Sequence, residues 1–254
     1  MADVIKVDDL SIRINNRVLV KNVSFSIEEG EAVLLSGANG IGKSTLLKSI
    51  MHLQESNIFV NGSIKCGCFE EILTLDRNEI QKFRSSMAYI QQKDEYAEMG
   101  DVRVGDIISE LGETFGKKRM SFGEVNDLID EWIPRKEDNC RVFDAKSKPS
   151  KLSGGEQRLL SVLSVIATRS KAKLFLIDEP LNNLDFANAR NISNLLNRAI
   201  KNNPQIGLLM VSHCRIFPFI TREIKLTPDG IIELPDCQKC YSCFGEPDQD
   251  GFYH

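Results

Sequence analysis

The hydrophobic pattern of the first fifty residues changes where a glycine-rich loop begins. Apolar and polar side chains alternate from Ile12 to Ile27, with a turn signal at Asn15-Asn16. This period of two predicts antiparallel strands with one solvated face. The run 32–35 is continuously apolar and predicts a central strand buried on both faces. The stretch 45–51 has apolar residues at helical spacing, so a strand, a loop and a helix are expected in that order.

The middle of the chain, from about residue 93 to residue 150, is more polar and less regular. It contains Trp132, Pro134 and Pro149 and a charge run at 135–138. We interpret this segment as a small, mainly helical subdomain inserted into the main domain.

Two helical patterns follow. Apolar residues at 159–166 are spaced as the wide face of a buried helix. The stretch 186–200, counted from Phe186, repeats at three and four residues, with Asp185 as the expected N-cap and Pro204 beyond the end.

Two further apolar runs, 174–177 and 207–211, predict buried strands between these helices. Strands that alternate with helices favour a mostly parallel sheet, whose ligands gather at the carboxyl ends of the strands. The expected fold class is therefore α/β, with a P-loop core, an N-terminal antiparallel β subdomain and the inserted helical subdomain.

Composition narrows the functional classes only slightly. The chain has 254 residues, 42% of them apolar, and a formal net charge of -4. This charge gives no overall attraction to nucleic acid, so no nucleic-acid partner is expected. The first residues lack the basic start and apolar block of a secretory signal, so we expect a cytoplasmic protein. No apolar run approaches the roughly 20 residues that cross a bilayer, so a membrane role would need a partner.

The loop from 37 to 44 fits the phosphate-binding pattern G-x-x-x-x-G-K-[ST] in a strand–loop–helix setting. Its glycines let backbone N–H groups converge on phosphate oxygens, and the helix N-terminus adds positive potential. A chance glycine-rich turn is the alternative, which the flanking strand and helix disfavour. Lys43 should reach the β and γ phosphates of ATP, and the Ser44 hydroxyl should ligate Mg²⁺. The predicted nucleotide-binding residues are Gly37, Ala38, Asn39, Gly40, Ile41, Gly42, Lys43, Ser44 and Thr45.

Two carboxylates, Asp178 and Glu179, directly follow the apolar run 174–177. Beside a phosphate-binding loop, Asp178 is expected to hold Mg²⁺ and Glu179 to polarise the attacking water as a general base. Adjacent acids also occur as simple solvated strand ends, and the upstream loop favours the functional interpretation.

The hexapeptide at 152–157, Leu-Ser-Gly-Gly-Glu-Gln, resembles the signature motif of the ABC (ATP-binding cassette) ATPases. Ser153 can donate a hydroxyl, while Gly154 and Gly155 open the backbone at a helix N-terminus, which makes a second anion site. The resemblance implies a head-to-tail dimer, either a homodimer or a pair with another ABC subunit. Each ATP would then lie between the phosphate loop of one subunit and the signature of the other.

Two further segments are similar to ABC motifs. Residues 89–92 resemble the Q-loop, which implies that Gln92 touches Mg²⁺ or water and senses a membrane-spanning partner. Gln91 stands where many members have proline, so it stays open as the alternative glutamine. Residues 182–185 resemble the D-loop, which implies that Asp185 lies at the dimer interface.

The last motif ends at His213, which resembles the H-loop histidine expected to hydrogen-bond the γ-phosphate. A structural histidine after a strand is the alternative. The resemblance covers roughly residues 4–234. It implies catalytic roles for Glu179, His213 and Gln92, and Mg²⁺ ligation by Ser44, Gln92 and Asp178.

Ile14 is a departure from the family, whose members usually stack the adenine on an aromatic residue of the N-terminal strands. Base stacking is worth about 1–3 kcal/mol. We therefore expect modest nucleotide affinity and weak discrimination between ATP and GTP.

The tail at 235–254 contains Cys237, Cys240 and Cys243, with Cys214 or His254 as a conceivable fourth ligand for tetrahedral Zn²⁺. No second C-x-x-C pair completes such a site. A solvated, metal-free tail is the favoured interpretation, and a zinc site is the alternative. The expected domain organisation is one ABC ATPase domain at 1–234 followed by this tail.

The leading functional hypothesis is an ATP-binding and hydrolysing subunit of an ABC transporter, peripheral on the cytoplasmic face of the cell membrane and bound to membrane-spanning permease subunits. The alternative is a soluble ABC ATPase in macromolecular assembly, such as iron–sulfur cluster assembly, for which the tail cysteines are the only hint. A non-enzymatic binding module is disfavoured by the joint presence of Glu179 and His213.

Overall fold

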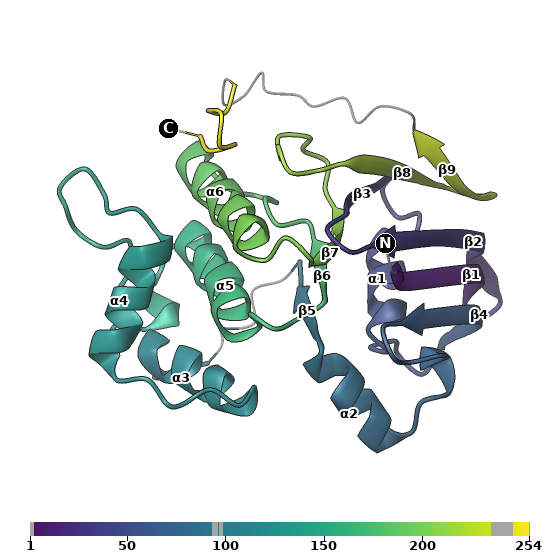
Figure 1. Cartoon of the computed structure of the whole chain (residues 1–254), viewed down its shortest axis with the longest axis horizontal. Coiled ribbons are helices and arrows are strands. Elements are labelled where there is room, and N and C mark those ends of the chain that lie inside the picture. Colours follow the sequence, from purple (N-terminus) through teal and green to yellow (C-terminus); the bar gives the residue numbers. More distant parts are fainter. Residues whose placement is uncertain (1–2, 93–95, 97–98, 235–245, 254) are drawn as a thin grey trace.

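The computed structural model describes residues 3–92, 96, 99–234 and 246–253, and it contains two sheets (Figure 1). The smaller sheet is antiparallel and has the strand order β2-β1-β4. Its strands are β1 (Asp3–Ile14), β2 (Arg17–Glu28) and β4 (Ile58–Cys66). The predicted antiparallel β subdomain is therefore confirmed. Val20, Phe25 and Ile27 are buried as the alternation requires, whereas Val18 is 57% exposed, contrary to the pattern.

The larger sheet has the strand order β5-β6-β7-β3-β8-β9. Neighbouring strands are parallel except for the antiparallel hairpin of β8 and β9. The predicted central strand is confirmed, because β3 lies between β7 and β8. The bounds are β3 (Ala32–Gly37), β5 (Met87–Ile90), β6 (Leu174–Asp178), β7 (Gly207–Val211), β8 (Arg222–Thr227) and β9 (Gly230–Leu234).

Two hydrophobic cores cover the two faces of the larger sheet. Along β3, Val33 and Leu35 pack in the core that contains α1 (Lys43–Ile50) and the antiparallel sheet. Leu34 packs in the other core, with α5 (Gly154–Thr168) and α6 (Phe186–Asn202). A strand whose successive side chains enter different cores has no solvated face, and this explains the unbroken apolar run in the sequence.

In the described part of the segment between β5 and α5 lie the α-helices α3 (Val104–Thr114) and α4 (Phe122–Trp132). Their buried apolar side chains, among them Ile108 and Ile129, belong to the same core as those of α5. Figure 1 shows them on the side of α5 that faces away from α6. The remaining helices are α2 (Arg77–Ser85) and the short η1 (Ile72–Thr74) and η2 (Pro149–Lys151).

Helix α6 begins where the sequence predicts. Asp185 is its N-cap and accepts a hydrogen bond from the backbone N of Asn188 at 2.8 Å, which satisfies a donor that the first helical turn leaves free. The apolar pattern is wrong for Phe186, whose side chain is 58% exposed in the first turn. The buried stripe of the helix starts at Ala189.

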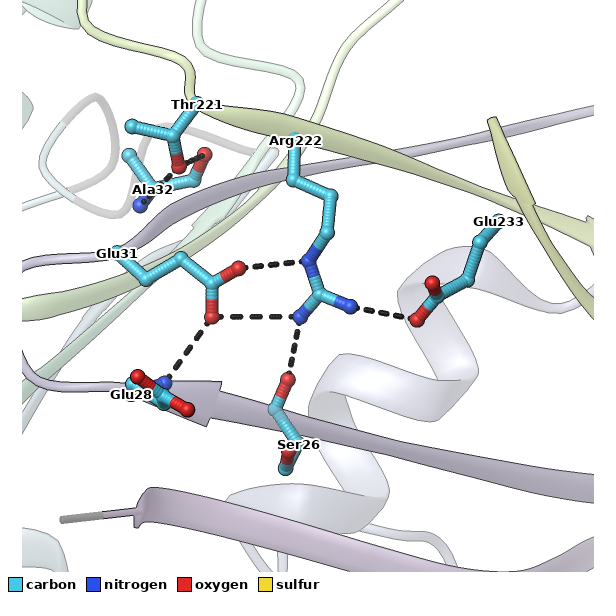
Figure 2. Close-up of polar contacts among 7 residues, drawn as sticks. All are labelled: Ser26, Glu28, Glu31, Ala32, Thr221, Arg222 and Glu233. Atoms are coloured by element: carbon cyan, nitrogen blue, oxygen red, sulfur yellow. Dashed lines mark hydrogen bonds and ion pairs between the residues drawn. The ribbon is translucent and has the colours of Figure 1, made fainter. Parts of the chain in front are cut away.

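Arg222 joins the two sheets (Figure 2). Its guanidinium pairs with Glu31 at 2.6 Å, pairs with Glu233 at 2.7 Å, and donates to the carbonyl oxygen of Ser26 on β2 at 2.6 Å. Next to it, the Thr221 hydroxyl accepts from the backbone N of Ala32 and donates to the carbonyl oxygen of the same residue. These bonds fix the start of β3 to both β2 and β8.

The end of the chain packs against α6. Tyr253 is 3% exposed, and its hydroxyl donates to the carbonyl oxygen of Ile216. The Asn194 amide binds the Tyr253 backbone twice, accepting from its N at 2.8 Å and donating to its O at 2.7 Å. The expectation of a solvated tail is therefore wrong for Tyr253, which is buried, whereas residues 246 and 248–250 are exposed as expected. The proposed zinc ligands Cys237, Cys240, Cys243 and His254 lie outside the described residues.

Within the described part of the chain, no helix combines the length and apolar character needed to span a bilayer.

The anchoring of the chain end can be tested at Tyr253. Tyr253→Phe removes only the hydroxyl bond and should lower the free energy of unfolding by about 1 kcal/mol. Tyr253→Ala also removes the buried ring and should cost about 3–5 kcal/mol. Urea unfolding measures both values. Ile232→Ala, at a position that is 52% exposed, is the control and should change stability by less than about 0.5 kcal/mol. Equal stability of Tyr253→Ala and the wild type would contradict this packing.

Candidate functional site

The loop between β3 and α1 requires glycine at two positions. Gly37 has φ of 142°, and a Cβ there would lie 2.7 Å from the carbonyl oxygen of Leu226. Gly42 has φ of 111°, and a Cβ there would lie 2.7 Å from a methyl carbon of Val20. Both the backbone conformation and the space therefore exclude a side chain. The loop is held close to the surrounding strands.

Lys43 starts α1 and is only 7% exposed. Its ammonium donates to the carbonyl oxygens of Gly37 at 3.0 Å and Ala38 at 3.1 Å. These bonds keep the charged end of the side chain over its own loop. An anion that enters the loop therefore meets a positioned cation.

Asp178 ends β6 and is 1% exposed. The Ser44 hydroxyl donates to its Oδ1 at 3.0 Å, across 134 residues of sequence. Burial raises the pKa of Asp178 above its ordinary value, while the bond from Ser44 and the positive charges of Lys48, Arg158 and Lys43 oppose the rise. A hydroxyl and a carboxylate at this distance offer the oxygen ligands that Mg²⁺ prefers.

Glu179 is 9% exposed and has φ of 46°, in the left-handed region. Its backbone N donates to the carbonyl oxygen of Val211 at 2.9 Å. Its Oε1 lies 3.2 Å from Nε2 of His213, which follows β7. The parallel sheet thus brings together a carboxylate and a histidine that the sequence predicts separately.

One cavity of about 540 Å³ collects most of the predicted residues. Gln92 lines it, which places the second glutamine of the pair at the cavity. The Gln91 carbonyl oxygen instead accepts from the guanidinium of Arg158. The cavity is lined by Ile14, Leu19, Asn39, Gly40, Gly42, Lys43, Ser44, Thr45, Gln92, Glu179, Asn182 and His213.

The signature residues Ser153, Gly154 and Gly155 do not line this cavity. Ser153 is the N-cap of α5 and forms a capping box with Glu156. Gly155 packs against α6, because a Cβ there would lie 2.2 Å from Nδ2 of Asn188. The predicted Asp185 also binds Asn188 and is absent from the lining. The N-termini of α5 and α6 therefore meet each other at the signature and the D-loop.

The sequence did not single out Leu19, Asn182 or Arg158. Leu19 lies within an alternating strand pattern, and Asn182 is marked in the sequence only as part of the D-loop-like segment. Arg158 directly precedes the apolar stretch 159–166 in the sequence. A charged residue next to a buried helix face is the only sequence signal for the role of Arg158.

The buried carboxylate of Asp178 gives a stability prediction. Because the folded state raises its pKa, the folded protein holds this proton more tightly than the unfolded chain does. Protonated Asp178 therefore stabilises the folded state below the ordinary aspartate pKa of 3.8. This stabilisation is lost as pH rises through the folded-state pKa of Asp178. Asp178→Asn should therefore raise the melting temperature of metal-free protein at neutral pH. Each kcal/mol gained corresponds to about 2–4 °C.

Thermal unfolding at several pH values measures this effect, and the difference from wild type should shrink on acidification. Asp130→Asn is the control of opposite sign, because hydrogen bonds from Arg141 and Arg135 lower the pKa of that carboxyl. A lower melting temperature for Asp178→Asn at neutral pH would contradict the account.

Comparison with known proteins identifies the family. Residues 20–182 match the model of a family described as "ABC transporter". The chain is 26% identical over 217 residues to a protein from Staphylococcus saprophyticus named "Putative hemin import ATP-binding protein HrtA", covering 84% of this chain and 90% of the relative. It is 27% identical over 215 residues to the "Phosphate import ATP-binding protein PstB" of Saccharolobus solfataricus, covering 83% and 79%.

A solved structure has a similar fold. It is titled "Dimeric Structure of MJ0796, a Bacterial ABC Transporter Cassette", with a TM-score of 0.71, 22% identity, and coverage of 91% of this chain and 99% of that one. The match of the family model spans more than half of this sequence. The chain therefore belongs to the ABC transporter family.

Proposed function

We propose that this chain binds ATP and Mg²⁺ in the cavity beside the phosphate loop and hydrolyses the ATP as the ATP-binding subunit of an ABC transporter. The observation that carries the proposal is that one cavity is lined by Lys43, Ser44, Glu179 and His213. A volume of about 540 Å³ is suited to a small-molecule ligand. The residues come from the ends of neighbouring parallel strands, where ligands bind in α/β folds.

In this proposal Ser44, Asp178 and Gln92 would hold Mg²⁺, which would neutralise charge on the phosphates. Ser44 and Asp178 already share a hydrogen bond of 3.0 Å, so their oxygens lie close enough to serve one cation. The backbone from Gly37 to Ser44 and the Lys43 ammonium bind the phosphates. Lys43 would exchange its bonds to loop carbonyls for bonds to phosphate oxygens.

Glu179 acts as the general base. Nε2 of His213 lies 3.2 Å from Oε1 of Glu179, and the second carboxylate oxygen is proposed to accept a proton from water. Because His213 also lines the cavity, it can contact the terminal phosphate and hold the carboxylate in one geometry.

The second half of the ATP site is proposed to come from another subunit. Ser153, Gly154 and Gly155 form a helix N-terminus suited to an anion, yet they line no part of the cavity of their own chain. In a head-to-tail dimer they would cover the ATP bound to the partner. The D-loop segment with Asp185 touches the signature helix through Asn188 and would cross the same interface.

The dimer is proposed to drive membrane-spanning permease subunits from the cytoplasmic face of the membrane, as a peripheral protein. The relatives named above are called import ATP-binding proteins, which favours transport over the assembly alternative. Ile14 and Leu19 would contact the base with apolar side chains, so weak discrimination between ATP and GTP is part of the proposal. Zinc in the tail remains an alternative that metal analysis would test.

Glu179→Gln tests the catalytic assignment. The amide cannot take a proton from water, so the hydrolysis rate should fall by about 10²–10⁴-fold. The variant should also accumulate as an ATP-bound dimer, which size-exclusion chromatography with ATP detects. Glu70→Gln, whose side chain is 87% exposed, is the control for the charge change. Hydrolysis at the wild-type rate in Glu179→Gln would refute the assignment.

Mixing two inactive variants tests the composite site. Lys43→Ala removes the phosphate cation, and Gly154→Val adds a side chain at a position where a Cβ meets no atom of its own chain within 4 Å. Each variant alone should be inactive. An equal mixture should recover about a quarter of wild-type activity, because half of the dimers are mixed and each of these keeps one intact site. Absence of recovery would contradict the composite arrangement.

A further inference from the structure

Arg158 occupies an unusual position for a charged residue. It lies in the second turn of α5, one turn after the signature glycines, and is only 3% exposed. Burial of a guanidinium is costly unless its donors are hydrogen-bonded. Its donors bind four main-chain carbonyl oxygens, those of Pro180 at 3.1 Å, Asp178 at 3.2 Å, Glu179 at 3.2 Å, and Gln91.

Three of these acceptors are consecutive and surround Glu179. The φ of 46° at Glu179 belongs to a region that residues with a side chain seldom adopt. Such a conformation persists only where the surroundings fix it. Arg158 donates to the backbone carbonyl oxygens of Asp178 and Glu179. On the other side, the backbone N–H of Glu179 donates to the carbonyl oxygen of Val211 at 2.9 Å. The backbone that aims the Glu179 carboxylate is therefore held from both sides.

The fourth acceptor links this turn to another element. Gln91 precedes Gln92, which lines the cavity. One planar guanidinium thus connects the segment of Gln92, the turn of Glu179 and the helix that starts with the signature. The fork of an arginine reaches several acceptors at once, which a lysine ammonium does not do in the same geometry.

We propose that Arg158 is a positioning residue for ATP hydrolysis, which holds Glu179 in its left-handed conformation and so aims the carboxylate at the cavity. The inference rests on the function proposed above. Arg158 would also couple the two ATP sites of a dimer. The N-terminus of α5 would contact the ATP of the partner, and Arg158 transmits a displacement of that helix to the general base of its own subunit.

A purely structural role makes a different prediction from a positioning role. An arginine that only stabilises the fold would change the melting temperature while leaving the kinetic constants of the folded enzyme unchanged. Burial raises the pKa of Asp178, and the charge of Arg158 is one of the contributions that oppose this rise. Arg158→Lys keeps that charge and removes the fork, so it separates the electrostatic effect from the geometric one.

The experiment measures ATPase kinetics of the full-length chain carrying Arg158→Lys or Arg158→Gln, each assayed below its own melting temperature. Displacement of a catalytic group by about 1 Å can cost 10²-fold, so kcat should fall by about 10–100-fold. KM for ATP should change by less than about threefold, because the phosphate loop is untouched. Arg158→Gln supplies a second test if Arg158→Lys does not fold.

Arg169→Lys is the matched control. Arg169 caps the other end of α5 and donates to the carbonyl oxygens of Arg84 and Ser85 at 3.3 and 3.4 Å. Arg169 does not line the cavity. This variant should keep the wild-type kcat even if its melting temperature falls.

A double-mutant cycle with Glu179→Gln tests whether Arg158 acts through Glu179. If it does, Arg158→Lys should cause no further loss of the residual rate in the Glu179→Gln background. A wild-type kcat in both Arg158 variants, or equal fold-losses in the two backgrounds, would overturn the inference while leaving the proposed function intact. A wild-type chain without ATPase activity would overturn both.

Discussion

The parallel pairing of β6, β7 and β3 is the constraint on which the site depends. Asp178 pairs with Val211 in the sheet, and Val211 pairs with Leu35. In a parallel ladder this register brings the carboxyl ends of all three strands to one edge. The phosphate loop, the two carboxylates and His213 each lie at or just after the carboxyl end of one of these strands, so the pairing of the strands brings them together. The two cores on either side of the sheet keep this edge from shifting, since every described position of β6 and β7 is buried.

The two buried cations at the site, Lys43 and Arg158, are held by main-chain carbonyl oxygens. Lys43 is bound by carbonyls of its own loop, and Arg158 by carbonyls around Glu179. Asp178 is bound by a hydroxyl. A buried charge that is fully hydrogen-bonded is held in one geometry, because each lost bond leaves a polar group unsatisfied. Lys43 and Arg158 are therefore held in defined positions before any ligand binds, and such preorganisation is what electrostatic catalysis requires.

The signature segment lies at the N-terminus of α5, apart from the cavity of its own chain. Ser153 and Glu156 form a capping box at the N-terminus of this helix. Gly155 has the separate task of allowing α6 to approach, through Asn188. Gly154 has free space beside it. Two adjacent glycines of one motif therefore differ: Gly154 has open space beside it, and Gly155 allows the chain's own helices to pack together.

The sequence by itself determined the features that local pattern encodes. Hydrophobic period predicted the strands at 32–35, 174–177 and 207–211 and the helix that Asp185 caps, because burial on one or two faces leaves a direct trace in the order of residues. The phosphate loop was predicted because its glycines must lie at fixed spacing. Tertiary structure alone decided the rest.

These features depend on partners far apart in the chain. Arg158 reaches a carbonyl 67 residues away, and Tyr253 reaches one 37 residues away. The acceptors are main-chain oxygens, which every residue possesses, so no side-chain pattern marks them in the sequence. The conformation of Glu179 and the docking of the chain end follow from such bonds, and only the folded chain brings their donors and acceptors together.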